Sequence, residues 1–486
     1  MCVPAVFLTP RHIEDSDPSS YSGSSEIILA SRSARYLVDL ALALLTEQRT
    51  PLPFKAYART KWKLFPHYDC IRAMTDMFRA WYPRDRVIFR SNMAPLKSVS
   101  ALVTVAACIC LSLAAPTGQD CTGTISSMDD VDDAVKCTTV NINSFTVPAG
   151  ETFNLDLADS TTVNMRKPLM HFFFLPLRSL ATDFSEGDVT FGNKTWDGPL
   201  FQISGKSVTF NGNSHTFDGN GPFYWDGQGG NGGVTKPAPM MKIKISGTFT
   251  NVKVLNSPAH VYSVSNPAAL VMSKLTIDDS LGDKPNSNSD GKAAGHNTDA
   301  FDASTTHLTI EDSTIMNQDD CLAINKGSNI IFQRNTCSGG HGISIGSISS
   351  DAKVSDITIR DNTITNNDQA LRIKTKASAT DASVTNVTYS GNTGTGLRRF
   401  GVIIDQSYPD TLGTPGTGVK ISGINFVGSE TSLSVNSKAK RVAVNCGSGS
   451  CTGTWDWSAL KVTGGSAGPI NYKGIKNFTS SYAAIL

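Results

Sequence analysis

Short stretches rich in β-branched residues recur along the second half of the chain, each followed by a polar turn. Four of them begin at Leu308, Ile330, Ile357 and Val387, and related stretches cover residues 249–255 and 269–277. Their spacing falls within the range of roughly 20 to 50 residues that indicates a solenoid. Short strands without intervening helical patterns favour coils of parallel strands. We therefore predict an all-β fold, a parallel β-helix, from about residue 140.

The predicted coils place Val, Ile and Leu inside and allow Asn or Thr at the turns to form hydrogen-bonded ladders. A β-sandwich would instead require hairpins with two-residue turns, and few are visible. Solenoids need capped ends. Residues 129–135 are expected to form a short helix at the N-terminal end, closed by Cys121 and Cys137.

One apolar segment, residues 166–178, lacks the alternation of a strand and interrupts 161–165 and 187–191, which could otherwise join as one strand region. We interpret residues 166–186 either as an insertion, such as a retained intron read as coding, or as a hydrophobic loop packed on one face.

A secretory signal is predicted in the interior of the sequence. A basic start at Met93 is followed by an apolar run from Val99 to Leu113 and by the small-x-small pattern that ends at Ala114. The run is short for a membrane span. We predict a signal peptide at 93–115 and a catalytic domain at 116–486. Residues 1–92 are either a wrongly extended start or a separate N-terminal region.

The charge balance narrows the classes of partner. The 486 residues carry a net charge of +1, and only 17% are charged. Nothing points to nucleic acid, because a nearly neutral protein does not attract polyanions by its overall field. Any anionic substrate must therefore be held by a few placed cations. The composition also excludes a coiled coil, a collagen and a charged disordered chain.

Cysteine usage fits secretion. The predicted mature chain keeps six cysteines, which allow many connectivities. Closeness in sequence favours the pairs Cys121–Cys137, Cys321–Cys337 and Cys446–Cys451. A metal site is disfavoured because no C-x-x-C pair is present. Sequons for N-glycosylation begin at Asn193, Asn386 and Asn477.

Three acidic residues are predicted to gather on one face. Asp299 and Asp319 lie about one coil apart, and Asp320 is adjacent. Carboxylates this close must differ in pKa, as an acid and a base in a glycosidase do. Two other interpretations are a solvated turn pair and a Ca²⁺ site. We also expect the side chain of Asp319 to be exposed in a cleft.

The following coils supply a histidine and two cations. His341 lies between glycines, where its ring would be accessible. Arg372 and Lys374 are two positions apart, so on a strand both point to one face. A solvated strand face is the commoner use of such a pair. The acids, the histidine and the cations nevertheless arrive in successive coils, which favours a functional site that binds a carboxylate.

Four ordered motifs carry a family resemblance: Asn297-Thr-Asp299, Gln318-Asp-Asp320, Gly340-His-Gly342 and Arg372-Ile-Lys374. The chain resembles the fungal polygalacturonases of glycoside hydrolase family 28, from about Thr117 to the C-terminus apart from the insert. The resemblance implies a right-handed parallel β-helix that hydrolyses α-1,4 bonds of galacturonan with inversion.

Roles follow from this resemblance by position. It implies that Asp319 is the general acid, that Asp299 and Asp320 activate water, and that His341 supports protonation of the acid. Arg372, Lys374, Tyr408 and Asn297 would bind the substrate. Two departures are Gln369-Ala370 in place of the family's frequent Asn-Gly before the last motif, and the lack of a cysteine after Cys451.

The resulting prediction is a secreted, endo-acting polygalacturonase that acts as a monomer on pectin, without cofactor or metal and without nucleic-acid or membrane partners. The alternatives are a rhamnogalacturonan hydrolase, a Ca²⁺-dependent pectate lyase and a non-catalytic carbohydrate-binding solenoid. The pair Arg372 and Lys374 favours a substrate that carries a carboxylate at the cleavage site. This favours polygalacturonate over rhamnogalacturonan. All three acidic residues are present, which favours an enzyme over a non-catalytic binding solenoid.

Overall fold

The structure is a computed structural model that describes residues 119–166, 187–478 and 484–485. The chain divides into two units, residues 1–100 and 101–486, and every described residue belongs to the second. The predicted extension at 1–92, the signal peptide at 93–115 and nearly all of the suspected insert at 166–186 lie outside the described residues.

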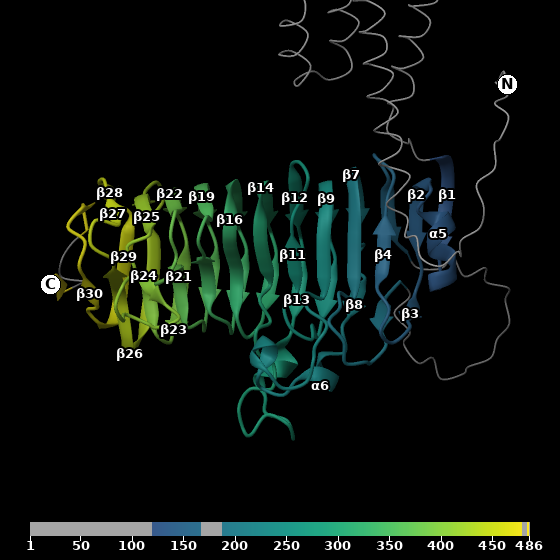
Figure 1. Cartoon of the computed structure of the whole chain (residues 1–486), viewed down its shortest axis with the longest axis horizontal. Helices are drawn as coiled ribbons and strands as arrows, with labels where there is room; N and C mark the ends of the chain where they lie inside the picture. Colours follow the sequence, from purple (N-terminus) through teal and green to yellow (C-terminus); the bar gives the residue numbers. More distant parts are fainter. Residues whose placement is uncertain (1–118, 167–186, 479–483, 486) are drawn as a thin grey trace, which may run out of the picture. The chain divides into compact units, whose positions relative to one another are not determined.

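The strands stack coil upon coil along one axis (Figure 1). Their pairings form three rows, which we call sheets A, B and C, and each row is parallel. Every strand pairing among the described residues is parallel, and in each coil the chain passes through sheet C, then sheet A, then sheet B. The predicted right-handed parallel β-helix is confirmed. Five strands are long enough to contribute to two sheets: β7 (Phe201–Asn211), β9 (Met241–Thr250), β14 (Phe301–Glu311), β16 (Asp320–Gln333) and β26 (Thr431–Asn445).

Sheet A contains the C-terminal parts of β7, β9, β14 and β16 together with β1 (Gln119–Ile125), β2 (Cys137–Ile142), β5 (Thr162–Met165), β12 (Leu270–Ser273), β19 (Lys353–Arg360), β22 (Ala382–Ser390), β25 (Val419–Phe426) and β27 (Cys451–Thr452). Sheet B contains the first part of β26 together with β3 (Phe145–Val147), β6 (Val189–Phe191), β8 (Thr216–Asp218), β10 (Lys253–Leu255), β13 (Thr276–Asp278), β15 (Thr314–Met316), β17 (Thr336–Ser338), β20 (Thr363–Thr365), β23 (Thr393–Leu397) and β29 (Leu460–Ser466). Sheet C contains the N-terminal parts of β7, β9, β14 and β16 and the end of β26 together with β4 (Phe153–Asp156), β11 (Tyr262–Val264), β18 (Gly342–Ile348), β21 (Gln369–Lys376), β24 (Phe400–Tyr408), β30 (Pro469–Ile470) and β32 (Ala484–Ile485). A separate pair is formed by β28 (Trp455–Asp456) and β31 (Ile475–Lys476).

The repeat read from the sequence is the register of sheet A. Leu308 pairs with Ile330, Ile330 with Ile357, and Ile357 with Val387. Each of these side chains is buried, with at most 1% exposed. The predicted repeat is therefore confirmed at single-residue register.

Asparagine side chains connect the coils at the corner between sheets A and B. Asn335 accepts a hydrogen bond from the backbone nitrogen of Ser313, Asn362 from that of Asn335, and Asn392 from that of Asn362. All three asparagines are buried. The predicted ladder is present, and it satisfies backbone groups that the tight corner would otherwise leave without partners.

The suspect segment lies at a corner that is tight in the other coils. Two residues separate β2 from β3, β14 from β15, β16 from β17 and β19 from β20, whereas residues 166–188 separate β5 from β6. The expectation that 161–165 and 187–191 form one strand region is wrong, because β5 pairs within sheet A and β6 within sheet B. Both interpretations of residues 166–186, as an insertion and as a packed loop, stay predictions, since nearly all of these residues lie outside the described ones.

The N-terminal end of the solenoid is capped as predicted. A 3-10 turn, η1 (Met128–Asp130), leads into the short helix α5 (Val131–Ala134), whose Val131 and Ala134 are buried. The three predicted disulfides, Cys121–Cys137, Cys321–Cys337 and Cys446–Cys451, are all present. The asparagines of the three sequons are exposed, and glycosylation of them stays a prediction.

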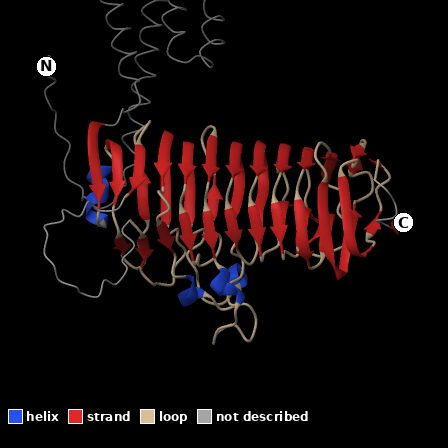
Figure 2. Cartoon of the chain, turned by 180° about the vertical axis from the view of Figure 1, so that it is seen from behind, coloured by secondary structure: helices blue, strands red, loops and turns tan. Residues whose placement is uncertain are grey.

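Two long connections from sheet B to sheet C project from one edge of the solenoid (Figure 2). The first carries α6 (Gly221–Tyr224) and η2 (Gly229–Asn231), and the second carries η3 (Ser280–Asp283). They border the N-terminal ends of β14 and β16, where the predicted acids lie. No helix within the described ranges is both long and apolar enough to cross a membrane.

Candidate active site

The predicted acids and the histidine lie where the chain enters sheet C in three successive coils. Asp299 precedes β14, Asp319 and Asp320 lie at the start of β16, and His341 precedes β18. Backbone hydrogen bonds fix this alignment: Ala300 donates to the carbonyl of Asp320, and His341 donates to that of Asp319. The structure thus brings these four residues together, as predicted.

Asp319 is held by three donors. Nδ1 of His341 lies 2.9 Å from Oδ1, the backbone nitrogen of Asp320 donates to Oδ1, and Nδ2 of Asn297 donates to Oδ2. Only 6% of Asp319 is exposed, so the expectation of an exposed side chain is wrong. Burial alone would raise the pKa of Asp319, but the hydrogen bond and charge of His341 and the charge of Lys374 outweigh it and lower the pKa.

Asp320 is completely buried and neutralised by a lysine. Nζ of Lys374 lies 2.6 Å from Oδ2, and the hydroxyl of Ser344 donates to Oδ1 at 2.7 Å. Burial by itself would lower the pKa of Lys374, but the charge of Asp320 raises it. Lys374 is therefore engaged with Asp320, and Arg372 is the more accessible of the two cations.

Asp299 has a histidine partner that sequence reasoning missed. Nε2 of His260 lies 3.6 Å from Oδ1 of Asp299, and Nδ1 lies 3.2 Å from Oδ2 of Asp302. Oδ1 of Asp299 is buried and accepts no hydrogen bond from the described residues. Burial and the charge of Asp319 raise the pKa of Asp299 well above its usual range, and the charge of His260 opposes this rise.

The charge state of His260 follows from these neighbours. Burial alone would lower its pKa, but the hydrogen bond with Asp302 and the charges of Asp299, Asp302 and Asp319 raise it to about 9. His260 lies one coil before Asp299, and the backbone of Val261 donates to the carbonyl of Asp299. The long connection between β13 and β14 lengthens this coil, so the regular spacing seen in the sequence could not reveal the contact.

His341 lies between two carboxylates. Its Nε2 is 3.8 Å from Asp368, which also binds Nε of Arg398 at 2.8 Å. Burial alone would lower the pKa of His341, but the hydrogen bond and charge of Asp319 raise it, so the ring favours its protonated form. Sequence reasoning missed Asp368 and Arg398, because neither belongs to a recurring pattern.

The remaining predicted residues surround this centre. The ring of Tyr408 on β24 lies 5.9 Å from Cζ of Arg372 and 5.5 Å from Nζ of Lys374, which confirms that both cations project from one face of β21. Asn297 adopts a left-handed backbone conformation. Its Oδ1 accepts from Gly230 and Asn231, so Asn297 connects the first long connection to Asp319.

Asp319, Asp320 and His341 place potential metal-ligand atoms within 4.8 Å of one another. Their donor atoms already have protein partners, however: Lys374 and Ser344 use both oxygens of Asp320, and His341 itself binds Asp319. A divalent cation would have to displace the ammonium group of Lys374. The donor set therefore fits an acid–base centre better than a Ca²⁺ site.

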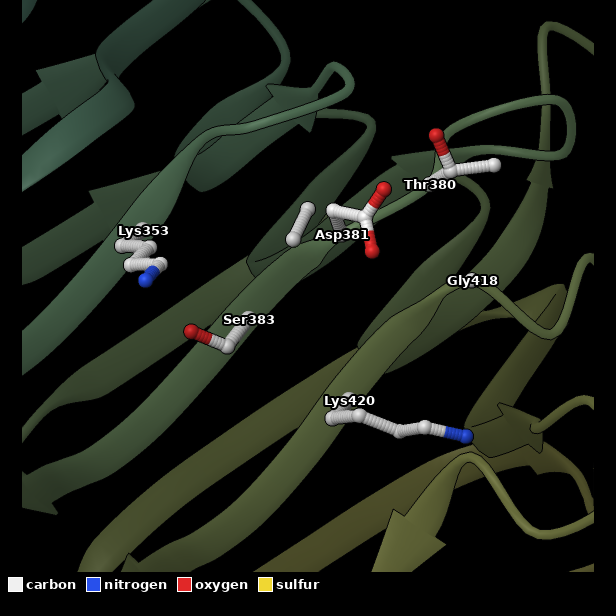
Figure 3. A pocket seen from close by; sticks show the side chains of 7 residues that line it. Lys353, Thr380, Asp381, Ser383, Gly418 and Lys420 are labelled. Carbon is white, nitrogen blue, oxygen red and sulfur yellow. The ribbon is translucent and has the colours of Figure 1, made fainter.

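A shallow groove lies on another face of the solenoid. It has a volume of about 560 Å³ and is lined by Lys353, Thr380, Asp381, Ser383, Gly418 and Lys420, among others (Figure 3). Its lysines come from β19 and β25 in sheet A, whereas the acids lie at the edge of sheet C. The groove carries none of the predicted catalytic residues.

The model of glycosyl hydrolases family 28 matches residues 137–484. The chain belongs to glycosyl hydrolases family 28. This confirms the predicted family and the prediction of a glycoside hydrolase. All four motifs and every residue of the centre described above lie within the matched range.

Relatives and solved structures agree with the family. Endopolygalacturonase I of Aspergillus aculeatus is 39% identical over 334 residues, which are 68% of this chain and 80% of the relative. A probable endopolygalacturonase A of Aspergillus parasiticus is 38% identical over 71% of this chain and 88% of its own.

Among solved structures, endopolygalacturonase I from Stereum purpureum, complexed with two galacturonates, is 46% identical. Its TM-score is 0.64, and the match covers 75% of this chain and 98% of that chain. An endo-xylogalacturonan hydrolase from Aspergillus tubingensis has a TM-score of 0.53, with 75% and 99% of the two chains covered, but is only 22% identical. This second likeness concerns the fold alone.

Proposed function

We propose that the protein is a secreted endopolygalacturonase that acts as a monomer on polygalacturonate and hydrolyses its α-1,4-galacturonosyl bonds with inversion. The observation that carries the proposal is the convergence of Asp299, Asp319 and Asp320 with Arg372 in neighbouring coils of sheet C. The names of the relatives and the galacturonates in the Stereum purpureum structure support the choice of substrate.

In the proposed reaction, Asp319 protonates the glycosidic oxygen while the bond from that oxygen to the anomeric carbon breaks. The pKa of Asp319 is low and that of His341 is raised, so the resting pair holds its proton on the imidazole, 2.9 Å from the carboxylate. Two coupled groups titrate as a unit. His341 thus supplies the proton that Asp319 delivers to the leaving oxygen.

Asp299 and Asp320 are proposed to accept the proton of the attacking water as its oxygen bonds to the anomeric carbon. Lys374 contacts Asp320 directly and compensates its charge, and the cationic His260 favours the ionised form of Asp299. Removing either cation would leave a buried carboxylate without compensation and therefore a weaker water-activating site.

Arg372 is proposed to bind the carboxylate of a galacturonate next to the cleaved bond. Its guanidinium group can form two parallel hydrogen bonds to a carboxylate, and Tyr408 packs beside it. A rhamnogalacturonan hydrolase would meet a neutral sugar at alternate positions, where this cation has no partner. The galacturonan substrate therefore suits the site better than that alternative.

The stereochemistry of the product needs its own measurement. Carboxyl groups of inverting glycosidases are usually roughly 6.5–9.5 Å apart, whereas oxygen atoms of Asp319 and Asp320 lie within 4.8 Å. Inversion is proposed from the family and not from this separation. Proton NMR of the first products should show the anomer of opposite configuration to the substrate, and retention would contradict the proposal.

The experiment that tests the function uses the protein with de-esterified polygalacturonate, with and without chelator. Reducing ends and unsaturated products are followed together. We expect chelator-resistant release of reducing ends without unsaturation and with a rapid fall in viscosity, which identifies endo-hydrolysis. Unsaturated products that disappear with chelator would identify a lyase and overturn the proposal.

A further inference from the structure

Two lysines of β9 repeat the arrangement of the two cations of β21. Lys242 and Lys244 are separated by the buried Ile243, as Arg372 and Lys374 are separated by the buried Ile373. Alternate residues of a strand point to the same face. Both pairs therefore project outward from sheet C, the sheet that carries the proposed catalytic residues.

The register of sheet C places the two pairs on the same rows of side chains. The row of Lys242 continues through Ser263, Asp302, Ala323 and Ser344 to Arg372. Parallel strands lie about 4.8 Å apart, so Lys242 lies about 10 Å before Asp302 and Arg372 about 14 Å after it. The acids are thus flanked along the solenoid axis by a cation pair on each side.

The charges of the lysines on β9 are uncompensated. Within the described ranges, neither Lys242 nor Lys244 forms an ion pair, whereas Lys374 is bound to Asp320. Lys244 is exposed, and its Nζ donates to Oε1 of Gln202 at 3.3 Å. Gln202 in turn donates to Asn154. The outer face of β9 therefore offers positive charge that no protein carboxylate binds among the described residues: Asp156, two strands before Lys244 on the same row, accepts from Ser204 instead.

An anionic polysaccharide needs such charges on both sides of the acids. Each unit of polygalacturonate carries a carboxylate, and the centre already contains Asp299, Asp302, Asp319 and Asp320. The carboxylates of the substrate and these aspartates repel each other, and in a partly buried site this repulsion weakens binding appreciably. Arg372 compensates the substrate on one side only. On the other side His260 is already engaged by Asp299 and Asp302, and the next cations on the outer face of sheet C are Lys242 and Lys244.

We propose that Lys242 and Lys244 form a second carboxylate-binding site for polygalacturonate, on the β9 side of the catalytic centre. This inference rests on the proposed function and extends it by locating where a longer chain is held. The site binds sugar units about two or more positions away from the cleaved bond. It therefore acts on affinity for long substrates and not on the chemical step.

The test uses the double variant Lys242→Gln/Lys244→Gln and a series of oligogalacturonates of increasing length. We expect the KM for long chains to rise about tenfold, as for the loss of about one charge-assisted contact, with kcat unchanged. The trimer, which is too short to reach from Arg372 to β9, should show no change. A KM that is unchanged at every length, or raised equally for the trimer, would overturn the inference.

The matched control is Lys353→Gln/Lys420→Gln, which removes the same charge from the groove of sheet A (Figure 3). An unchanged KM in the control supports a local site, and an equal rise would mean that general electrostatic attraction is responsible and overturn it. Calorimetric binding of the same oligomers on an Asp319→Asn background tests the lysines without turnover. Failure of the unmodified protein to cleave polygalacturonate would overturn the proposed function, while the binding series would still decide the role of the lysines.

Discussion

At the scale of single residues, two histidines determine how readily the carboxylates of the centre take up protons. His260 faces Asp299 and Asp302, and His341 faces Asp319 and Asp368. Each histidine therefore balances two carboxylates in a site where burial disfavours charge. Changing one histidine should alter the proton affinity of its own acid before it alters the fold.

We predict that His260→Gln shifts the acidic limb of the pH profile of kcat/KM to higher pH by about one unit. His260 is cationic below its pKa of about 9, and its charge lowers the pKa of Asp299. Without it the pKa of Asp299 rises, so Asp299 becomes ionised only at higher pH. The pH dependence of kcat/KM reports on groups of the free enzyme and is the measurement to make.

The control for this variant is His307→Gln. His307 is exposed on β14, and among the described residues its ring hydrogen-bonds only to Thr306. Its profile should coincide with that of the unmodified protein. A profile of His260→Gln that also coincides would show that His260 does not influence the water-activating carboxylate.

Asp319→Asn should lower kcat by a factor of about 10³ or more, because an amide cannot deliver a proton to the leaving oxygen. The backbone nitrogen of Asp320 can still donate to the amide oxygen, whereas Nδ2 of Asn297, which donates to the other carboxylate oxygen, loses its acceptor; the melting temperature should therefore fall only slightly. Single-turnover kinetics and thermal unfolding together check this. Activity near that of the unmodified protein would remove Asp319 from the role of acid.

The two cations of β21 should differ in what their loss affects. Lys374→Met removes the cation that binds the fully buried carboxylate of Asp320. Breaking such a buried pair costs about 3 kcal/mol of folding free energy. Arg372→Gln removes a half-buried group and should raise KM with little loss of stability. Chemical denaturation and kinetics on both variants separate these effects, and equal stability of the two would contradict the structural role of Lys374.

The motif residues could be predicted because each lies at a fixed offset within a coil. Asp299, Asp319 and His341 were placed together from the sequence, and the structure agrees. Burial of Asp319 could not be predicted, because Asn297, which bonds to it from the preceding coil, is itself held by the first long connection, whose course has no periodic pattern. His260 was missed because the long connection between β13 and β14 lengthens its coil, and Asp368 was missed because it belongs to no recurring pattern.

At the scale of the elements, regular corners made the fold predictable. Coils with short corners between sheets A and B kept the repeat regular enough for the hydrophobic pattern to reveal it, from Leu308 through Ile330 and Ile357 to Val387. The coil from Tyr262 to Phe301 is longer than these, because the connection containing η3 intervenes. Such a connection has no periodic pattern, so sequence reasoning could not register the strands on either side of it.

The asparagine ladder gives a prediction at this scale. Asn362→Ala should destabilise the solenoid by about 2 kcal/mol, because it leaves the buried nitrogen of Asn335 without its partner and removes a hydrogen bond to the carbonyl of Phe332. Asn154→Ala is the matched control, since Asn154 is exposed on β4 and its side chain bonds only to Gln202 among the described residues. Urea denaturation compares the two, and equal midpoints would show that the ladder contributes nothing.

At the scale of the whole molecule, the solenoid axis is also the axis of the proposed substrate site. Successive coils contribute the cations of β9, the acids before β14 and β16, and the cation of β21. Polygalacturonate carries one carboxylate per sugar unit, and the outward side chains of sheet C also repeat at a regular spacing along the axis. The fold therefore supplies both the catalytic cluster and an extended surface without a second domain.

The first coil makes the domain prediction testable. Its open end is covered by α5, with Val131 and Ala134 packed on the core, and is closed by Cys121–Cys137. We therefore expect a chain consisting of residues 116–486 to fold by itself, with the melting temperature and the kcat of the full chain. Differential scanning calorimetry and kinetics check this. As a control, Cys121→Ser/Cys137→Ser in the same chain should lose about 3 kcal/mol of folding free energy, as expected for a disulfide that closes a short loop. A shortened chain that aggregates or melts lower than the full chain would show that residues before 116 contribute to the solenoid, and would overturn the domain boundary.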